Sequence, residues 1–382
     1  MKKLFSKVVA SAALLFSITL TTTSVSAEEE KKQYLIGFEN QIEVSEFIES
    51  SEKVDGEMSI LAEVNNEKVE MELLYEFDSI PVVSVELSPE DLAELKADSS
   101  ISFIEEDLEV SIANQTTPWG ITRVQAPFAH SIGLTGWGVK VAVLDTGIAT
   151  HPDLNIRGGV SFVPGEPTYQ DGNGHGTHVA GTIAALNNSI GVIGVAPNAE
   201  LYAVKVLGAN GNGSVSSIAQ GLQWSAENGM DIANLSLGSP MGSPTLELAV
   251  NQATAAGVLV VAATGNNGSG TVSYPARYAN ALAVGATDQN NNRASFSQYG
   301  TGLDIVAPGV GVQSTYLQNQ YASLSGTSMA TPHVAGVAAL VKEKNPTWSN
   351  IEIRQHLSNT ATPLGNPTQY GSGLVNAEEA VR

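Results

Sequence analysis

Apolar segments alternate with helical stretches between residues 139 and 308, and this alternation limits the possible fold more than any other feature. The apolar segments are near-continuous runs, which is typical of strands that are covered on both faces. The helical stretches between them include 176–186, 215–229 and 245–257. Together they predict an α/β fold in which a parallel sheet is flanked by helices. The expected strands are VKVAVLD (139–145), LYAVKVL (201–207), DIANLSL (231–237), VLVVAATG (258–265), ALAVGA (281–286) and LDIVAP (303–308).

The segment from residue 28 to residue 113 has a different composition and a different pattern. It holds 25 of the 39 Asp and Glu residues of the chain but only 5 of its 18 Lys and Arg residues. Its periodicity predicts a small α+β domain of ferredoxin-like β-α-β-β-α-β order. A small, polar, unperiodic linker, SIANQTTP, follows it, so we expect a second domain over residues 114–382. The expected strands are 34–38, 69–77, 81–88 and 101–106, and the expected helices are 41–52 and 88–99.

Residues 1–27 have the pattern of a secretory signal peptide. Lysines at positions 2, 3 and 7 precede the apolar run VVASAALLFSITL, and Val-Ser-Ala ends at residue 27. The apolar run is too short and too serine-rich for a permanent membrane span. We therefore expect a secreted, extracellular protein that has no membrane contact once the signal peptide is removed.

The chain has no cysteine, so an exported protein of this sequence must hold its loops by packing, hydrogen bonds or bound ions. It also has no basic stripe of the kind that nucleic-acid-binding proteins carry. Nucleic acid is therefore not an expected partner. No feature of the sequence indicates an oligomer, and we expect a monomer.

Four polar residues fall at the carboxyl ends of expected strands or at the starts of expected helices, where the active crevice of such a fold lies. Asp145 ends the strand of VAVLDTG, and Asn266 directly follows VLVVAATG. His175 lies where the glycine-rich loop of DGNGHGTHVAG turns into a helix, and Ser328 opens the helix TSMATPHVAGVAALVKEK. Each residue alone could be structural, as a turn acceptor, a loop histidine, an Asx-turn residue or an N-cap. Their coincidence at one edge favours a catalytic site.

The chemistry of these four residues is complementary. A serine hydroxyl is a poor nucleophile until a base accepts its proton, and a neutral imidazole suits that role near neutral pH. The carboxylate of Asp145 can fix the tautomer of His175 and stabilise the imidazolium. The amide of Asn266 and the backbone N–H of Ser328, at a helix N-terminus, can donate hydrogen bonds to an oxyanion.

Three sequence blocks, VAVLDTGI, HGTHVAGTIAA and GTSMATPHVAG, resemble in this order the signature blocks of the subtilisin-like serine proteases. The resemblance extends from about Gln115 to Arg382 and is greatest to the secreted alkaline subtilisins of bacilli. It implies that Asp145, His175 and Ser328 form the triad of a serine endopeptidase and that Asn266 belongs to its oxyanion hole.

The resemblance also implies how the precursor is organised and what it binds. Residues 28–113 resemble the propeptide of the family, an intramolecular inhibitor that assists folding and is removed by self-cleavage, here expected after Ala113. Proteins and peptides are the implied substrates, with broad specificity and a preference for a large apolar residue before the scissile bond. The implied substrate-binding residues are Gly211, Asn212, Gly213, Ser236, Leu237, Gly238, Ala263 and Gly265.

The segment LNNSIGV (186–192) interrupts the helix that follows His175 and offers carbonyl and amide oxygens in a tight loop. It resembles the calcium loop of the family, so Ca²⁺ is the implied structural cofactor, and an all-oxygen ligand set suits this ion. The implied ligands are Gln115, Asp153, Leu186, Asn188, Ile190 and Val192. A second, weaker cation site is implied near Ala276, Tyr278 and Ala281.

Three further residues lie close to the expected catalytic residues. His178 could suggest a metal pair with His175, but no HExxH carboxylate accompanies it, which favours a role in helix packing. His333, one turn inside the helix of Ser328, is expected to be structural or at the edge of a pocket. Met329 adjoins the expected nucleophile, so its sulfoxide should crowd the oxyanion site and lower activity.

Two other functions use the same features. A binding or scavenging protein on the same fold would be expected to have lost a catalytic residue, and Asp145, His175 and Ser328 are all present. An esterase or lipase could use the same triad. The GxSxG nucleophile elbow is absent around Ser328, however, and the order Asp, His, Ser differs from the order in that fold.

Overall fold

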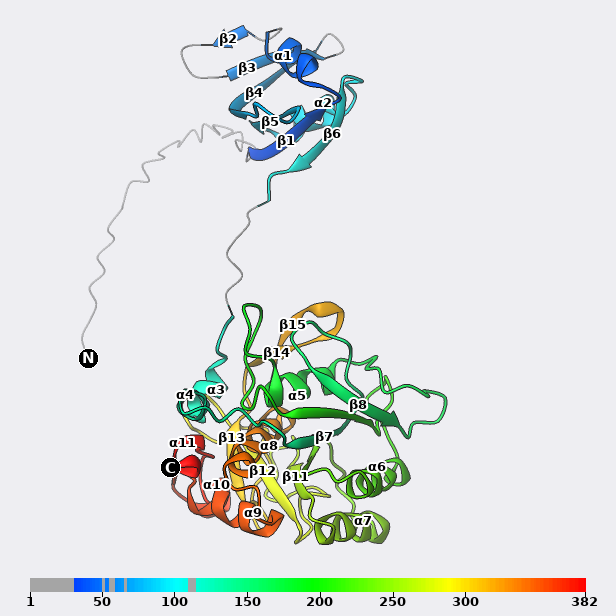
Figure 1. Ribbon diagram of the computed structural model, residues 1–382, viewed down its shortest axis with the longest axis vertical. Helices are drawn as coiled ribbons and strands as arrows, with labels where there is room; N and C mark the ends of the chain where they lie inside the picture. Colours follow the sequence, from blue (N-terminus) through cyan, green and yellow to red (C-terminus); the bar gives the residue numbers. More distant parts are fainter. Residues whose placement is uncertain (1–30, 50–51, 55–58, 65–66, 109–114) are drawn as a thin grey trace, which may run out of the picture. The chain divides into compact units, whose positions relative to one another are not determined.

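A computed structural model describes residues 31–49, 52–54, 59–64, 67–108 and 115–382 of the chain. The chain divides into two compact units between Ser111 and Ile112 (Figure 1). The expected signal peptide and the expected cleavage point after Ala113 lie outside the described residues. Among the helices of the described ranges, none has the length and apolar character needed to cross a membrane.

The smaller unit is an α+β domain built on one antiparallel sheet, with strand order β2-β3-β4-β5-β1-β6. Strand β1 lies between β5 and β6. Buried residues such as Ile36, Val83 and Val85 form the hydrophobic core of this domain. The elements are β1 (Lys32–Phe38), α1 (Gln41–Glu49), β2 (Glu52–Val54), β3 (Ser59–Val64), β4 (Glu67–Glu76), β5 (Val82–Leu87), α2 (Pro89–Leu95) and β6 (Ile101–Glu106).

The expected β-α-β-β-α-β order corresponds to β1, α1, β4, β5, α2 and β6, which keep the ferredoxin-like arrangement. The prediction missed β2 and β3, which extend the sheet beside β4. These strands are short, EKV and SILAEV, and they are defined by pairing, of β2 with β3 and of β3 with β4, rather than by local periodicity. Both helices also end earlier than expected, at Glu49 and Leu95.

The larger unit contains the expected parallel sheet, with seven strands in the order β13-β12-β11-β10-β7-β9-β8. The strands are β7 (Lys140–Asp145), β8 (Ile156–Ser161), β9 (Glu200–Lys205), β10 (Ile232–Leu235), β11 (Leu259–Ala263), β12 (Ala281–Thr287) and β13 (Ile305–Pro308). All six expected strands are present. Strand β8 was missed because its sequence, IRGGVS, contains two glycines and no apolar run.

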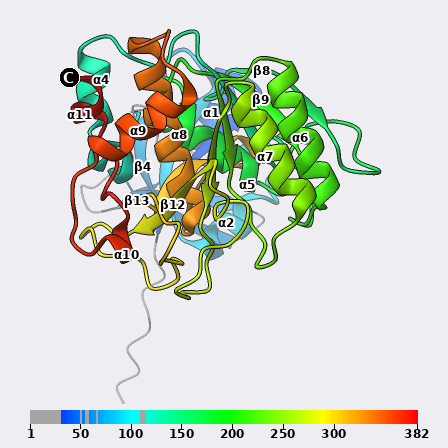
Figure 2. The same cartoon turned by 90° about the horizontal axis from the view of Figure 1, so that it is seen from below.

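Helices cover both faces of this sheet (Figures 1 and 2). Helices α5 and α8 pack on one face, and α6 and α7 pack side by side on the other. The remaining helices, α3, α4, α9, α10 and α11, were not predicted. The helices are α3 (Trp119–Arg123), α4 (Ala126–Ser131), α5 (His175–Ala184), α6 (Val215–Glu227), α7 (Pro244–Ala255), α8 (Thr327–Lys344), α9 (Asn350–Asn359), α10 (Pro367–Tyr370) and α11 (Ala377–Val381).

Side chains of the central strands alternate between the two helical layers, which explains their continuous apolar runs. Val141 and Val143 of β7 belong to the core around α8, whereas Ala142 and Leu144 belong to the core on the opposite face. A polar residue inside such a strand would therefore be buried on either face. Polar groups can reach solvent only where the strands end.

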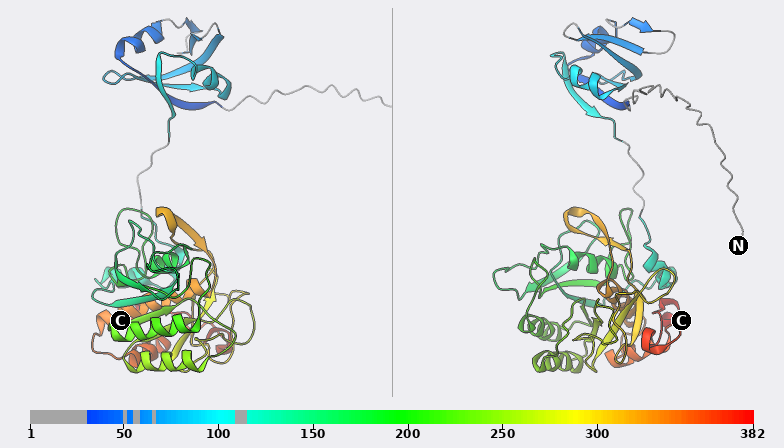
Figure 3. Two further views of the ribbon diagram at one scale, coloured as in Figure 1. Left: turned by 90° about the vertical axis from the view of Figure 1, so that its right-hand side faces the viewer. Right: turned by 180° about the vertical axis from the view of Figure 1, so that it is seen from behind.

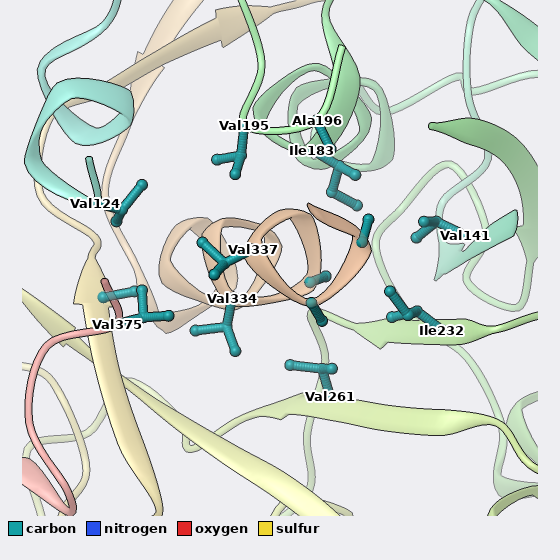
Figure 4. Close-up of a cluster of buried hydrophobic side chains, with 14 of the residues drawn as sticks. Val124, Val141, Ile183, Val195, Ala196, Ile232, Val261, Val334, Val337 and Val375 are labelled. Carbon is teal, nitrogen blue, oxygen red and sulfur yellow. The ribbon is translucent and has the colours of Figure 1, made fainter. Parts of the chain in front are cut away.

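Helix α8 runs through the interior, although it carries the expected nucleophile at its start. Figure 4 shows Val334 and Val337 of α8 among Ile183, Val195 and Ile232 from surrounding elements. Every residue of α8 from Met329 to Val341 is buried. Ser328, by contrast, is half-buried at the first turn. The packing of α8 therefore fixes this residue at the surface of the sheet edge.

The strand order reverses at β7, because β9 and β8 lie on one side of it and β10 to β13 on the other. Ligands of open parallel sheets bind at such a switch point, beyond the carboxyl ends of the strands. A hairpin of β14 (Val312–Thr315) and β15 (Tyr321–Leu324), orange in Figures 1 and 3, packs against α5. The Ser314 hydroxyl donates to the His178 carbonyl at 2.7 Å, which contributes to this packing.

Candidate active site

Asp145 and His175 form the best-defined pair at the carboxyl edge of the sheet. Asp145 is the last residue of β7, and His175 is the first residue of α5. The Nδ1 atom of His175 lies 2.7 Å from Oδ1 of Asp145, and Asp145 is fully buried. This contact fixes the proton of a neutral imidazole on Nδ1 and leaves Nε2 as the basic atom.

The environment of His175 favours its protonated form. Burial alone would lower the pKa of His175, but the charge of Asp145, its hydrogen bond and the charge of Asp171 outweigh burial and raise that pKa above its ordinary value. A base with a raised pKa accepts a proton more readily, and it loses its function as the pH falls through that pKa.

Asp171 holds the start of α5, where His175 lies. Its carboxylate accepts hydrogen bonds from the Thr146 hydroxyl at 2.9 Å, from the Gly174 amide at 3.0 Å and from the Thr177 hydroxyl at 2.7 Å. The Thr146 hydroxyl in turn accepts the amide of Gly176 at 2.9 Å. An anion at a helix N-terminus is favoured by the helix dipole. The sequence reading missed Asp171, whose only local signal is its place in the loop before His175.

Ser328 lies at the same edge, at the first turn of α8, and its hydroxyl is engaged with Ser236. The Ser328 hydroxyl donates to the Ser236 carbonyl at 3.0 Å, and the Ser236 hydroxyl donates to the Ser328 carbonyl at 2.8 Å. Among the described residues, no hydrogen bond joins Ser328 to His175. The structure thus pairs Asp145 with His175 and directs the Ser328 hydroxyl toward Ser236, the residue that directly follows β10.

Asn266 is oriented by Thr327, the residue before Ser328. The Asn266 Oδ1 atom accepts the Thr327 amide at 2.8 Å and the Thr327 hydroxyl at 2.9 Å. Since its oxygen is held in this way, Asn266 can present its amide nitrogen to the cavity that Ser328 also lines. Two hydrogen-bond donors, the Asn266 side chain and the Ser328 backbone at the start of a helix, therefore flank one space. The sequence reading did not identify Thr327.

All eight expected substrate-binding residues line two adjacent cavities, which have volumes of about 410 and 300 Å³. Leu237 and Gly238 line both cavities. The larger one is also lined by His175, Gly211, Asn212, Gly213 and Ser236, and the smaller one by Ala263, Gly265, Asn266 and Ser328.

The larger cavity has apolar lining residues that the sequence reading missed. Ile218, Leu246 and Tyr274 come from α6, α7 and the segment after β11, and Met241 is 77% exposed beside them. These positions are far apart in sequence. Only the packing of the helices on the sheet brings them to one groove.

His178 and His333 are structural histidines. Both are fully buried, and burial lowers the pKa of each to about 4. The ring Nε2 of His178 donates to the carbonyls of Val312 and Ala322, and the ring of His333 contacts the Met329 carbonyl at 2.8 Å. This confirms the packing role expected for His178. Met329 is 2% exposed.

Protonation of these two histidines should destabilise the enzyme in acid. Their folded-state pKa values are depressed, so the unfolded chain binds protons more readily and the free energy of unfolding falls as the pH drops from about 6.5 towards 4. We expect a loss of about 3 kcal/mol per histidine at pH 4. Urea unfolding of enzyme whose serine is blocked by a sulfonylating inhibitor measures this loss, and His333→Gln should show a shallower decline. An identical decline in the variant would contradict this role for His333.

The expected calcium loop forms a cage of oxygen atoms. The side-chain nitrogen of Gln115 lies 2.5 to 3.4 Å from four oxygens, namely the Leu186, Ile190 and Val192 carbonyls and Asn188 Oδ1. The buried carboxylate of Asp153 adjoins this cage, accepting the Asn188 side-chain amide at 2.8 Å and the Val192 amide at 3.0 Å.

This donor set fits a hard cation. The side-chain NH₂ group of Gln115, which is partially positive, lies at the centre of the converging oxygens, where a cation would lie. The negatively charged carboxylate of Asp153 lies beside these oxygens. In the part of the chain that the structure describes, no group of three His, Cys, Asp or Glu side chains forms a metal site. A cation site here must therefore be built mainly from carbonyl and amide oxygens.

The residues of the expected second cation site lie together in one turn. Ala276, Tyr278 and Ala281 are buried, and the Tyr278 carbonyl accepts the Ala281 amide at 3.0 Å. The Tyr278 hydroxyl is engaged with the backbone of Ser243 at 2.8 and 2.9 Å. These hydrogen bonds stabilise the conformation of the turn without a bound ion.

Comparisons with known proteins identify the family of this chain. A family model described as "Subtilase family" matches residues 136–373. The chain is 72% identical over the full length of both chains to "Alkaline protease" of Alkalihalobacillus alcalophilus. It is 67% identical, again over both full lengths, to "Alkaline elastase YaB" of Bacillus sp. (strain YaB). It is 80% identical to "Subtilisin Savinase" of Lederbergia lenta over 268 residues, which are 70% of this chain and all of that protein.

Proposed function

Because the chain belongs to the subtilase family and is a serine endopeptidase, we propose that Asp145, His175 and Ser328 are its catalytic triad. The observation that carries this proposal is the 2.7 Å contact of the buried Asp145 with His175, at the sheet edge where Ser328 begins α8. Family membership also sets aside a scavenging protein and a lipase-type esterase as the main function.

The geometry supports an acyl-enzyme mechanism. Nε2 of His175 accepts the proton of Ser328 as the hydroxyl attacks the substrate carbonyl, and it then gives that proton to the leaving amine. Asp145 keeps the imidazole in the correct tautomer and stabilises the positive charge that forms on it. Water then repeats the sequence on the acyl-enzyme and releases the second product. Each step needs His175 to be neutral at the start.

Asn266 and the backbone amide of Ser328 are the proposed oxyanion donors. Both flank the smaller cavity, and two bonds from Thr327 hold the Asn266 oxygen away from the developing anion. Donors fixed in advance stabilise the transition state because they need no reorganisation during the reaction.

The two cavities are the proposed substrate groove. Gly211 to Gly213 and Ser236 to Gly238 are backbone segments that can pair with an extended peptide, which reads the main chain and gives broad specificity. The smaller cavity, lined by Ala263 and Gly265, is the proposed pocket for a large apolar residue before the scissile bond. Proteins and peptides are therefore the proposed substrates.

The precursor is proposed to contain three parts: a signal peptide over 1–27, an inhibitory propeptide over 28–113 and the peptidase domain over 114–382. The compact α+β unit that ends near Ser111 supports the second part. The mature enzyme is proposed to be a secreted extracellular monomer.

Intact-mass measurement of the product from the wild-type gene and from Ser328→Ala tests this organisation. The wild type should start near Asn114, whereas the variant should keep residues 28–113. Equal trimming of both proteins would show that another protease removes the segment. Retention of the segment by both would show that it is not a removable propeptide.

Ca²⁺ is the proposed structural ion of the oxygen cage. Gln115, Asp153 and Asn188 would hold it through side-chain oxygens, and Leu186, Ile190 and Val192 through carbonyls. When bound, the ion would neutralise the buried charge of Asp153 and cross-link the start of the larger unit to the 186–192 loop. The second site at Ala276, Tyr278 and Ala281 stays a prediction.

Removal of calcium should lower thermal stability. A site occupied at 100 to 1,000 times its Kd contributes about 3 to 4 kcal/mol, which excess chelator removes. Differential scanning calorimetry of inhibitor-blocked enzyme with and without chelator measures this loss. Asn188→Ala should reduce the calcium response, whereas Asn290→Ala, in the exposed 288–292 turn, should keep it. A chelator-insensitive midpoint in the wild type would refute the site.

Peroxide should lower activity through Met329. The side chain is buried and directly follows Ser328, whose backbone amide is a proposed oxyanion donor, so an added oxygen crowds the proposed oxyanion site. Peptide mapping and activity assays on the same samples measure the effect, and Met329→Leu should resist peroxide. Full activity after demonstrated oxidation of Met329 would contradict this expectation.

A further inference from the structure

A buried lysine next to the triad has no part in the mechanism above. Lys205 ends β9 and is 1% exposed. Its Nζ donates to the Thr146 carbonyl at 2.6 Å and lies 2.9 Å from Oε2 of Glu166. Since Thr146 directly follows Asp145, Lys205 connects the carboxylate of Glu166 to the turn that carries the acid of the triad.

Glu166 also contacts the substrate-edge segment, which we define as residues 208–213. Its second oxygen, Oε1, accepts the amide of Ala209 at 3.1 Å. The Ala209 carbonyl accepts a hydrogen bond from the side-chain amide of Asn173 at 2.9 Å, and Asn173 lies two residues before His175. Both backbone polar groups of Ala209 are thus held by groups that adjoin the triad.

The substrate-edge segment has little support of its own. Residues 209–213 are exposed, and the segment closes on itself through the Gly208 amide, which donates to the Asn212 carbonyl at 2.8 Å. A short exposed loop of this kind keeps one position only if its root is fixed. Glu166 and Asn173 supply that fixation at Ala209.

Glu166 itself is held in place by a tight turn. The sequence Val163-Pro-Gly-Glu166 places proline at the second turn position and Gly165, with φ +81°, at the third, and the Glu166 amide donates to the Val163 carbonyl at 3.1 Å. The Ser161 hydroxyl donates to the Glu166 carbonyl. The carboxylate therefore starts from a fixed backbone, although its side chain is 37% exposed.

We propose that Glu166 is a positioning residue that sets the substrate-edge segment relative to the triad, and so determines how much rate the enzyme gains from substrate residues before the scissile bond. This inference rests on the proposed pairing of Gly211 to Gly213 with substrate. A segment displaced by about 1 Å would bind an extended peptide out of register with Ser328, which costs rate although the triad is intact.

The test compares two substrates with the same leaving group, one with a single acylated residue before the scissile bond and one with four residues. In Glu166→Ala, kcat/KM for the long substrate should fall by about 10-fold or more, and that for the short one by less than about 2-fold. Glu166→Gln should keep more of the gain, because its amide oxygen can still accept from Ala209. Glu227→Gln, on the exposed face of α6, should behave as the wild type.

Loss of Glu166 also leaves the charge of Lys205 buried without its partner, so a second variant separates the two effects. The double variant Glu166→Ala, Lys205→Met should recover the thermal stability that Glu166→Ala loses. It should not recover the higher kcat/KM that the wild type shows for the long substrate. The inference would be overturned if the double variant recovered the higher kcat/KM for the long substrate. It would also be overturned if Glu166→Ala lowered kcat/KM equally for both substrates. If the wild type itself gains nothing from the longer substrate, the proposed groove is wrong; if the gain persists in Glu166→Ala, only the inference about Glu166 fails.

Discussion

Replacing Ser328 with alanine should lower kcat on a peptide substrate by about 10⁶-fold, which is the loss measured when a subtilisin loses its nucleophile. The residual rate should stay about 10³-fold or more above the uncatalysed reaction, because the proposed oxyanion donors and the groove remain. KM should change little, since the cavity residues are unaltered. A loss of this size corresponds to about 8 kcal/mol of transition-state stabilisation.

The measurement needs a variant that has been freed of residues 28–113. A trace of active enzyme can remove the segment and then be inactivated by an inhibitor before the assay. Ser325→Ala is the matched control, because this serine is exposed, lies three residues earlier and accepts the Gly311 amide at 2.9 Å. It should retain activity within about 2-fold. If Ser328→Ala kept more than a tenth of wild-type kcat, Ser328 would not be the nucleophile.

Replacing Asp145 with asparagine should lower kcat by about 10⁴-fold, which is the size of loss found when known serine proteases lose the aspartate of their triad. The side-chain amide of asparagine can donate to Nδ1 of His175, which then holds its proton on Nε2, and that tautomer cannot accept the serine proton. The fold should survive, since the two side chains have nearly the same shape and Asp145 Oδ2 has no hydrogen-bond partner among the described residues.

The same variant should change the pH dependence in a defined direction. The charge and hydrogen bond of Asp145 raise the pKa of His175 against the effect of burial. Wild-type activity is therefore lost as the pH falls through a value above 6.5, and Asp145→Asn should move this acid limb to lower pH. Profiles of kcat/KM against pH and an NMR titration of the His175 ring measure the shift. Asp288→Asn, in an exposed turn, should leave the limb in place; an unmoved limb in Asp145→Asn would rule out this account.

Local patterns singled out Asp145, His175 and Ser328 because each of them lies at a boundary that the sequence marks. Asp145 ends an apolar run, Ser328 begins a long helix, and His175 follows a glycine-rich loop. In a parallel sheet such boundaries share one edge, so the alternation of strands and helices was enough to bring these residues together. The roles of the residues stay a proposal until the variants are assayed.

The missed elements have no such boundary. Strand β8 contains two glycines and lies at the edge of the sheet, and β2 and β3 are formed by the pairing of β2 with β3 and of β3 with β4. Strand β8 pairs with β9, which is distant in sequence, whereas β2 and β3 are short strands that pair with their neighbours along the chain, and in both cases local propensity is too weak to indicate the strand. The same holds for the apolar wall of Ile218, Leu246 and Tyr274.

The parallel sheet, the α+β character of the acidic segment and the sheet edge that carries Asp145, His175 and Ser328 can all be predicted from the amino-acid sequence, since they follow from periodicity and from where apolar runs end. The groups that surround these three residues emerge only from the packing of the folded chain. Asp171 at the start of α5, Thr327 on Asn266 and Glu166 between Lys205 and Ala209 are long-range or loop contacts. No repeat or motif encodes such contacts, because the distance between two side chains is set by how the helices and loops pack on the sheet.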